Sequence, residues 1–341
     1  MARHLGIDLH RNRFTVCTRC ENGRTYFKTV ELKHLARFAA SLRPDDEVAV
    51  EMTTNTRLFV NVVQETAKRV VVVDPAKFKI VSESTKKTDK NDAELLAFFL
   101  SKDMLPELRM KDKNREKLHS LAQTRDKLVK QRTQLKNKIN NVLAGYGILL
   151  KREELASDKA LSRVLEYDID PVVNLELGVL VEQIRSLNGS IKKLDDAIKK
   201  EGEKHPDHKI LKSIKGIGDK GASILLSIIG DVNDFESEKK LAAYFGIVPR
   251  VSNSNETERS GRITKKGTKL GRTTLVQCGL IAKRYSPYLL NFHERVKRRR
   301  GGGKANIALA RKLLSIVYKA LKNRWVFTDF PAFEYRTLEA A

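Results

Sequence analysis

Two carboxylates lie three residues apart in the stretch Lys87-Thr88-Asp89-Lys90-Asn91-Asp92-Ala93, directly before a helix-like run that continues to Lys102. If the helix begins near Asn91, Asp92 lies in its first turn and Asp89 about one turn earlier. Side chains at this spacing share a face, so both carboxylates can point the same way. A lone acid at a helix start is most simply a cap favoured by the helix dipole. A chemical role therefore requires further acids aimed at the same point.

The residues before this stretch alternate between strand-like and helix-like runs. Short β-rich or apolar runs predict strands at 5–8, 14–18, 25–30, 47–52 and 70–73, and helical spacing predicts helices at 32–42 and 56–68. Asn22-Gly23 is a hairpin signal between the second and third strands. The order β-β-β-α-β-α-β, followed by another helix, matches the ribonuclease-H-like fold. We therefore expect an α/β domain over residues 1–105.

Four acids occupy corresponding places in this order. Asp8 ends the first strand, Glu51 lies near the end of the fourth, and Asp89 and Asp92 begin the late helix. In the ribonuclease-H-like fold these places meet at one end of the sheet. Phosphoryl transfer on nucleic acid often uses two divalent cations roughly 4 Å apart, and Mg²⁺ prefers oxygen ligands. Because crowded carboxylates repel one another without cations, we predict that all four are catalytic and bind Mg²⁺ or Mn²⁺.

The charge of the chain predicts a polyanionic partner, most plausibly nucleic acid. The formal net charge is +24 and the pI is about 9.9. Residues 259–324 contain nineteen Lys or Arg and one acid, and residues 109–138 contain eleven against three acids. The individual candidates for nucleic-acid contact are Lys86, Lys87, Lys90, Arg259, Arg262, Lys265, Lys266, Lys269, Arg272, Arg298, Arg299 and Arg300.

Other classes of protein are disfavoured. No apolar run reaches the roughly 18 residues of a membrane span, and the N-terminus runs straight into a strand-like segment, so we do not expect a signal peptide. Cys17 and Cys20 form an isolated C-x-x-C in a strand-like run, which places the two side chains on opposite faces. We therefore expect free thiols in a reducing cytoplasm, no zinc site and no membrane partner.

Residues 106–206 are expected to form long helices. Residues 107–145 read as one helix, with Leu121, Leu128, Leu135 and Val142 recurring every seven residues. A second helix over 177–198 has two heptad columns, a pattern that favours a coiled coil. Its partner is either another subunit or the first long helix of the same chain. The columns consist of Leu177, Ile184, Ile191 and Ile198, and of Leu180, Leu187 and Leu194.

Residues 207–330 are expected to form a mostly helical second domain, followed by a tail over 331–341. The run 210–222, with Gly216 and Gly218, reads as a helix-hairpin-helix element or as a simple helical packing unit. Residues 252–260 are polar and rich in hydroxyls, and we expect a flexible loop there. The dense basic stretch that follows suits contacts to a phosphate backbone.

Three pieces of the first domain resemble one family, the DEDD-type insertion-sequence transposases, also called bridge-RNA-guided recombinases. They are Gly6-Ile7-Asp8, Val50-Glu51-Met52-Thr53 and the stretch 87–93. The family letters D, E, D and D map onto Asp8, Glu51, Asp89 and Asp92 in a RuvC-like domain. The family often has Ala-Thr-Gly after its Glu, where this chain has Met-Thr-Thr.

The resemblance extends to the second domain and implies a serine nucleophile for DNA. In the family that serine follows "G-[LI]-x-P" and precedes "G-x-I-[ST]-K-x-G", which here is Gly261–Gly267. Alignment back from this run places it at Ser254. The family often has Ser-Gly where this chain has Ser254-Asn255, so Ser260 and Ser252 remain alternatives. The resemblance also implies donor and target DNA, a structured guide RNA, and a homo-oligomer, dimer or tetramer, that uses the coiled coil.

Two other functions fit parts of this pattern. A hydrolytic nuclease of the Holliday-junction-resolvase kind would use the acids and water without a serine. A nucleic-acid-binding protein without enzymatic activity would explain the charge but not the four acids at one sheet end. We therefore expect a transposase that cuts and rejoins DNA strands.

Overall fold

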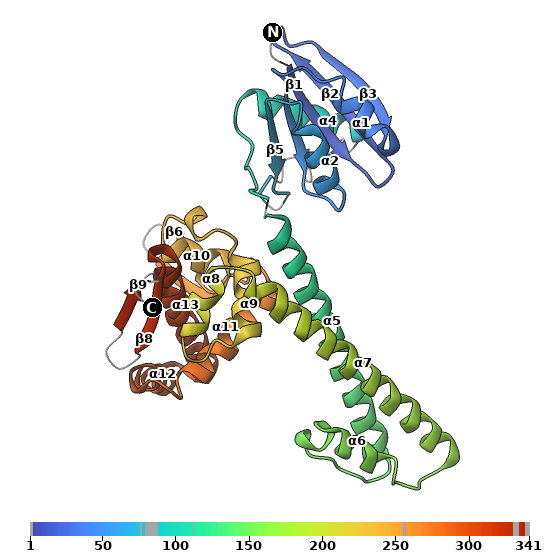
Figure 1. Cartoon of the computed structure of the whole chain (residues 1–341), viewed down its shortest axis with the longest axis vertical. Helices are drawn as coiled ribbons and strands as arrows, with labels where there is room; N and C mark the ends of the chain where they lie inside the picture. The colour runs from blue at the N-terminus through green and yellow to red at the C-terminus, as the bar shows by residue number, and fades with distance from the viewer. Residues whose placement is uncertain are drawn as a thin grey trace. The chain divides into compact units, whose positions relative to one another are not determined.

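A computed structural model of the chain describes residues 3–75, 77–78, 88–110, 112–254, 257–329 and 334–337. The chain divides into two compact units (Figure 1). The N-terminal unit comprises residues 1–110 and the C-terminal unit residues 111–341. Each unit has its own hydrophobic core.

The N-terminal unit is built on a five-stranded mixed sheet of order β3-β2-β1-β4-β5. β1 and β2, and β2 and β3, are antiparallel, whereas β1, β4 and β5 run parallel. The sheet and its helices follow the expected order. Their bounds are β1 Arg3–Leu9, β2 Arg13–Cys20, β3 Thr25–Glu31, η1 Leu32–His34, α1 Leu35–Ala39, β4 Glu47–Glu51, α2 Thr56–Val63, β5 Arg69–Val73 and α4 Asp89–Ser101.

Alternation along the strands separates the two faces of this sheet. Ile7 and Val50 pack with Phe59 in the core beneath α1 and α2. Gly6 faces α4, where a Cβ atom would lie 2.0 Å from the Ala93 carbonyl oxygen. Only glycine therefore permits α4 to pack this closely on β1.

The late helix begins two residues earlier than expected, at Asp89 rather than near Asn91. The cap is Thr88, whose hydroxyl accepts a hydrogen bond from the Asn91 backbone N–H at 3.2 Å. A threonine hydroxyl satisfies an otherwise unpaired helical N–H, so neither aspartate has to act as the cap. Both acids lie in the first turn.

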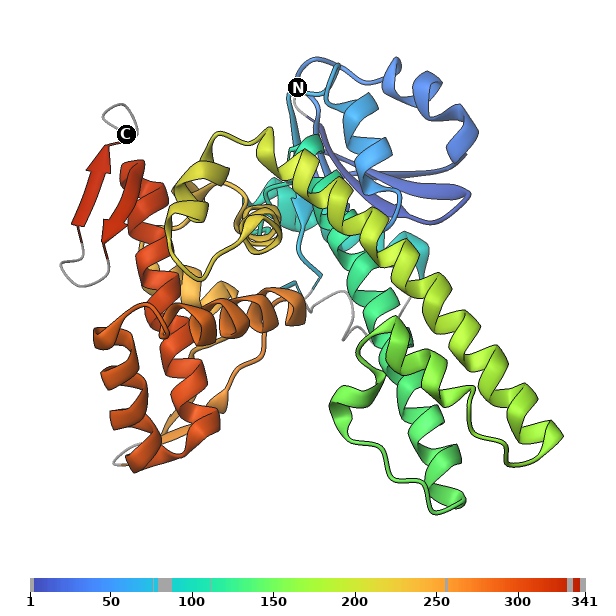
Figure 2. The same cartoon turned by 60° about the horizontal axis from the view of Figure 1, so that its bottom comes forward.

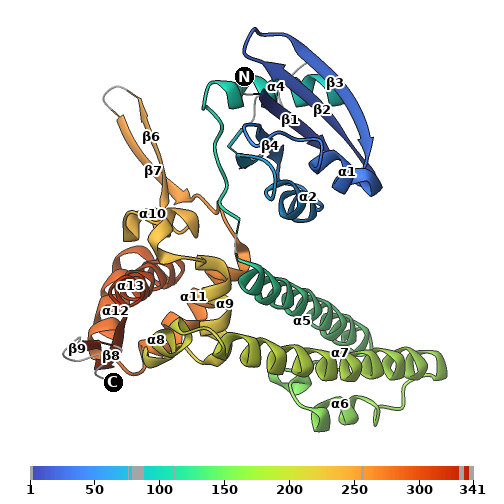
Figure 3. The same ribbon diagram turned by 45° about the horizontal axis from the view of Figure 1, so that its top comes forward.

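Two 33-residue helices, α5 (Lys113–Gly145) and α7 (Pro171–Glu203), pack against each other in the C-terminal unit (Figure 3). The expected start of the first at residue 107 is wrong. Asp112 caps α5 by accepting from two backbone N–H groups, and the Leu108 N–H instead donates to the carbonyl of Val72 in β5.

The packing between these helices is more polar than the heptads indicated. The column of α7 that contains Ile184 and Ile191 is buried as expected, and its partner is α5 of the same chain. The expected column of α5 is only half-buried, because the buried positions belong to the columns of Leu118 and Ala122. Two arginines interrupt the column of Leu118: Arg125 donates to Asp195 at 2.7 Å and Arg132 to Asn188 at 2.8 Å.

The rest of the C-terminal unit is a helical core with two small hairpins (Figure 2). α13 and α9 each contribute more buried residues than any other helix of this core. The bounds are η2 Arg152–Leu155, α6 Asp158–Val164, α8 Asp207–Ser213, α9 Asp219–Ile229, η3 Val232–Asp234, α10 Glu238–Tyr244, β6 Pro249–Ser254, β7 Thr257–Ile263, α11 Lys269–Ala282, α12 Pro287–Arg300, α13 Gly302–Asn323, β8 Trp325–Asp329 and β9 Glu334–Thr337.

The expected loop over 252–260 is wrong for the residues that the structure describes there. They form the antiparallel hairpin β6–β7, which projects from the helices of its unit (Figure 3). The pairing uses backbone hydrogen bonds, which a polar sequence can make as well as an apolar one. None of the described helices combines the length and apolarity needed to cross a membrane.

Candidate metal centre and nucleic-acid surface

Asp8 and Glu51 lie at the same end and on the same face of the sheet. Their strands are parallel neighbours in which Ile7 pairs with Val50. Asp8 and Glu51 are the next residues of their own strands. Because Ile7 and Val50 point into the core beneath α1 and α2, the next residues point to the opposite face, which α4 covers. The loop after Glu51 is held in place, since Thr56 donates to the Glu51 carbonyl at 2.9 Å.

The first turn of α4 brings two further carboxylates to this end of the sheet. Asp89 is half-exposed, and Asp92 is buried. The close packing at Gly6 places this turn beside the end of β1. The positive end of the helix dipole favours negative charge here, which offsets part of the repulsion between the acids.

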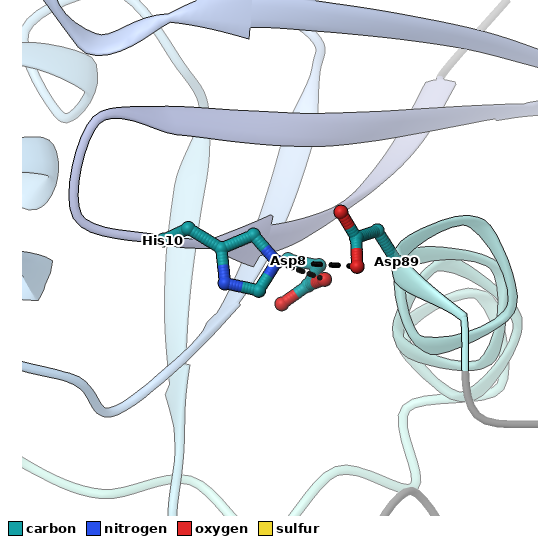
Figure 4. Close-up of side chains that lie close together, drawn as sticks. All are labelled: Asp8, His10 and Asp89. Atoms are coloured by element: carbon teal, nitrogen blue, oxygen red, sulfur yellow. Dashed lines mark ion pairs between the residues drawn. The ribbon is translucent and has the colours of Figure 1, made fainter.

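Asp8, His10 and Asp89 converge on one point (Figure 4). His10 Nε2 lies 3.1 Å from Asp8 Oδ2 and 3.3 Å from Asp89 Oδ1. Each side chain offers one ligand atom, and the three atoms lie within 4.8 Å of one another. Arg13 Nη2 also lies 3.4 Å from Asp89 Oδ2. Two carboxylates and an imidazole are a suitable donor set for a divalent cation.

The electrostatics of Asp8 fit a site that needs positive charge. Burial raises the pKa of Asp8 above its ordinary value, and the negative charges of Asp89 and Asp92 raise it further. His10 acts in the opposite direction. The charges of Asp89 and Asp92 therefore interact with that of Asp8. The pairing of β1 with β4 places Glu51 at the same end of the sheet.

The sequence interpretation missed His10. The signal was present in the spacing, because Gly6, Asp8 and His10 are two residues apart and alternation puts them on one side of β1. The backbone of His10 is fixed by its N–H, which donates to the Arg13 carbonyl at 2.9 Å.

The three candidate serines lie on the β6–β7 hairpin of the C-terminal unit. Ser254 is the last residue of β6, opposite Thr257. Ser252 lies opposite Arg259, and Ser260 opposite Val251. Ser254 is thus the candidate nearest the end of the hairpin. The side chains of residues 252–260, including that of the predicted contact Arg259, lie outside the described part of the structure. Lys86 and Lys87 lie outside it entirely.

Most of the other predicted nucleic-acid contacts are exposed. Lys90 lies in the first turn of α4, and the arginines of 298–300 lie in the last turn of α12, where the helix dipole favours cations. Among the described residues, no carboxylate lies within 4.0 Å of these three arginines. The remaining exposed candidates are Arg262, Lys265, Lys266 and Lys269.

Arg272 supports the basic loop after the hairpin. Its Nη1 donates to the carbonyls of Gly267 at 2.8 Å, Lys265 at 3.1 Å and Phe245 at 3.4 Å. Gly267 has φ +104°, and a Cβ atom there would lie 2.1 Å from the Tyr244 carbonyl oxygen. The loop therefore has a defined conformation in which the lysines face solvent.

The two basic stretches of the sequence meet in the C-terminal unit. A cavity of about 300 Å³ lies between α5 and the start of α11. Lys127 and Lys130 of the first stretch line it together with Lys269 of the second, and Asp126 pairs with Lys130. The stretches can therefore contribute to one nucleic-acid surface.

The three cysteines are free, and Cys17 and Cys278 are buried. Burial raises the pKa of Cys17 to about 12 and that of Cys278 to about 11. At neutral pH both remain thiols rather than thiolate nucleophiles.

Two models of transposase families match separate parts of the chain. A DEDD-type IS110 domain described as "Transposase" matches residues 5–148, and the "Transposase IS116/IS110/IS902 family" matches residues 208–294. The first match contains all four acids and implies a ribonuclease-H-like fold with divalent-metal use. The second contains the β6–β7 hairpin.

Individual relatives cover most of the chain. The transposase of insertion sequence element IS1111A from Coxiella burnetii is 25% identical over 325 residues, which are 93% of this chain and 89% of the relative. The transposase of IS1328 from Yersinia enterocolitica is 26% identical over 279 residues, 81% of this chain and 83% of the relative. A pilin gene-inverting protein from Moraxella lacunata is 31% identical over 256 residues, 71% of this chain and 68% of the relative. The chain therefore belongs to the DEDD-type transposases of the IS110/IS116 family.

Proposed function

We propose that this transposase cuts DNA through a covalent serine–phosphate link that depends on divalent cations held by Asp8, Glu51, Asp89 and Asp92. The observation that carries the proposal is the convergence of Asp8 and Asp89, from a strand and a helix 81 positions apart in the sequence, on one point. The relatives that move or invert DNA segments support the substrate class.

The acids supply the negative charge that makes cation binding favourable. When bound, Mg²⁺ or Mn²⁺ polarises a phosphoryl oxygen and favours ionisation of the attacking hydroxyl. The strand ends and the capped first turn of α4 hold the carboxylates at fixed places, so little reorganisation is needed on binding. Burial and the raised pKa of Asp8 make this end of the sheet unfavourable without positive charge.

Ser254 is our candidate nucleophile, ahead of Ser260 and Ser252. Its Oγ would form a bond to phosphorus while the bond from phosphorus to a deoxyribose oxygen breaks. The serine proton leaves to solvent, and the departing oxygen takes up a proton. The phosphoserine link preserves the bond energy, so attack by another DNA hydroxyl can rejoin strands and release the serine.

The cationic side chains would hold the nucleic acids while the strands are exchanged. The loop that follows the hairpin, the end of α12 and the cavity beside α5 provide exposed positive charge for phosphate contacts. We propose donor and target DNA as ligands, and a structured guide RNA as a further one, on the strength of the family resemblance.

We also propose a homo-oligomer that forms through the tip of the α5–α7 pair. Residues 150–184 contain eight Asp or Glu and four Lys or Arg, so this region repels nucleic acid although the chain carries +24 overall. Val172, Leu175 and Val179 lie on one face of α7 and are 74%, 69% and 51% exposed. An apolar row in acidic surroundings fits a protein partner.

Incubation with labelled DNA and Mg²⁺ tests the serine mechanism directly. We expect a protein–DNA adduct that survives denaturation, that maps to Ser254 by mass spectrometry and that is lost in Ser254→Ala. Ser252→Ala and Ser260→Ala are the matched controls on the same hairpin. Loss in one of the controls instead would move the assignment to that serine. Cleaved DNA with free ends and no adduct would favour a hydrolytic nuclease and refute the serine mechanism.

Sedimentation tests the oligomer separately. Replacement of Val172, Leu175 and Val179 by serine should lower the association state without loss of helical content. Ile281→Ser, which changes an exposed apolar residue of α11, should leave association unchanged. An unchanged association state in the triple variant would refute the role of the tip.

A further inference from the structure

His10 lies between two of the proposed metal-binding acids, yet the proposed function gives it no role. Its Nε2 lies 3.1 Å from Asp8 Oδ2 and 3.3 Å from Asp89 Oδ1 (Figure 4). The side chain is 45% exposed, so the imidazole borders solvent rather than filling the core.

The backbone at His10 is fixed from two sides. Its N–H donates to the Arg13 carbonyl at 2.9 Å, within the turn between β1 and β2. The Asn55 side chain donates to the carbonyls of His10 at 3.3 Å and Arg11 at 3.0 Å. The turn therefore fixes the backbone that carries the imidazole, and a fixed backbone helps to preorganise a ligand.

The spacing of the donor atoms fits one cation. Adjacent ligands of an octahedral cation with bonds of about 2.1 Å lie roughly 3 Å apart. The two distances from His10 Nε2 to the aspartate oxygens are close to this value. A cation beside all three atoms would have one nitrogen and two oxygen ligands from this chain.

A nitrogen ligand changes which cation is favoured. Mg²⁺ prefers oxygen ligands and sheds its waters reluctantly. Imidazole suits first-row transition metals better. Mn²⁺ accepts carboxylate and water as Mg²⁺ does, but gains more from an added nitrogen.

We propose that His10 is a direct ligand of the divalent cation at this site and that the site therefore prefers Mn²⁺ over Mg²⁺. The inference rests on the proposed metal centre and adds a residue outside its four acids. The competing arrangement is a hydrogen bond, in which His10 orients Asp8 and Asp89 without touching the cation.

Electron paramagnetic resonance of Mn²⁺ bound to the full chain distinguishes these arrangements. A coordinated imidazole nitrogen couples to the unpaired electrons, and we expect this ¹⁴N coupling in the wild-type protein. It should disappear in His10→Gln, which offers an oxygen in place of the nitrogen. It should persist in His34→Gln, a change at an exposed residue of η1. Thermal unfolding of each variant checks that it is folded.

The affinities provide a second readout. Free Mn²⁺ is measured from its own resonance signal, and Mg²⁺ by competition with Mn²⁺. We expect His10→Gln to weaken Mn²⁺ binding about 10-fold or more, by analogy with the effect of losing a metal-site partner, and to weaken Mg²⁺ binding much less.

Each outcome decides between the claims. If both cations bind without ¹⁴N coupling, and their affinity ratio is the same in His10→Gln, the inference is wrong while the metal centre stands. If neither cation binds the wild-type protein, the proposed metal centre fails and the inference fails with it. The wild-type spectrum alone is decisive if His10→Gln does not fold.

Discussion

The acidic end of the sheet and the serine hairpin differ in how their residues are held. Asp8 and Asp89 are carried by a buried strand and a capped helix that touch at Gly6. Ser254 is the last residue of β6, in a two-stranded hairpin that projects from its helices. A site that brings several carboxylates together needs rigid supporting elements, because the negative charges repel one another. A nucleophile that must reach DNA can instead be presented at the end of an extended element.

The change Gly6→Ala tests whether the close packing of α4 on β1 holds the acids in place. In Gly6→Ala the new Cβ would lie 2.0 Å from the Ala93 carbonyl oxygen and 2.4 Å from the Ala97 nitrogen. Overpacking of this kind costs about 1–3 kcal/mol or more, and it would push α4 and its two acids away from β1. We expect the largest loss of thermal stability and complete loss of metal binding.

Gly178→Ala is the matched control for that change. Gly178 lies within α7, and a Cβ atom added there would have no atom of a neighbouring element within 4 Å, so alanine should stabilise the helix by up to about 1 kcal/mol. Equal stability of Gly6→Ala and the wild-type protein would show that α4 is not held by close packing on β1.

The change Gly267→Ala tests whether the conformation of the basic loop after the hairpin matters for DNA binding. Gly267→Ala places a side chain at φ +104° and against the Tyr244 carbonyl, so the basic loop must change conformation. We expect DNA affinity to fall severalfold while Mn²⁺ binding stays at the wild-type value. Fluorescence anisotropy with DNA and metal titration on the same preparation measure both. A loss of both activities would contradict separate roles for the two regions.

The salt dependence of DNA binding tests whether the arginines at the end of α12 contact phosphates. Changing Arg298, Arg299 and Arg300 to glutamine should reduce the slope of log affinity against log salt by about 0.9 for each phosphate that the protein no longer neutralises. The control changes Lys151, Lys159 and Arg163 to glutamine, which alters the charge equally within the acidic tip. Equal slopes for the two triple variants would argue against the end of α12 as a DNA-binding element.

The smallest expected effect is a gain in stability at the acidic end. The folded-state pKa of Asp8 is raised above its ordinary value of 3.8, so ionisation of this acid costs stability. The favourable contribution of the protonated form is fully present below pH 3.8 and is lost as pH rises through the raised pKa. Asp8→Asn should therefore unfold at a slightly higher temperature than wild type at neutral pH, but not in strong acid.

Divalent cations provide the complement to that measurement. They should raise the unfolding temperature of the wild-type protein and have little effect on Asp8→Asn. A lower unfolding temperature for Asp8→Asn at neutral pH would mean that the ionised Asp8 stabilises the fold, which is contrary to mutual repulsion among the acids.

The order of strands and helices in the N-terminal unit could be predicted because its core residues are apolar and regularly spaced. The placement of Asp8 and Glu51 at the same end of the sheet could also be predicted, since parallel strands end together at one edge of a sheet. The start of α4 was misplaced by two residues because a threonine hydroxyl competes with an aspartate for the cap. The spacing of His10 from Asp8 was visible in the sequence, but its closeness to Asp89 of α4 depends on packing between elements, and His10 was missed.

Prediction was weaker in the C-terminal unit, where polar contacts decide the structure. Arg125 and Arg132 lie in the seam between α5 and α7 because partners on α7 satisfy them, and hydropathy cannot reveal this. The β6–β7 hairpin pairs through its backbone, so its polar sequence was interpreted as a loop. The partial burial of these arginines depends on contacts between elements, and so does the pairing of polar strands; local hydropathy predicts neither.

The central claim is that formation of the serine–DNA adduct requires the acids of the N-terminal unit. The most direct test is the yield of the protein–DNA adduct in Asp89→Asn, with Asp103→Asn, an exposed aspartate beyond the end of α4, as the matched control. We predict a loss on the order of 10³-fold in Asp89→Asn, as expected when several kcal/mol of transition-state stabilisation are removed, and a normal yield in the control. An adduct that forms at the wild-type rate in Asp89→Asn would contradict the claim, because the hairpin would then act without the acidic end of the sheet.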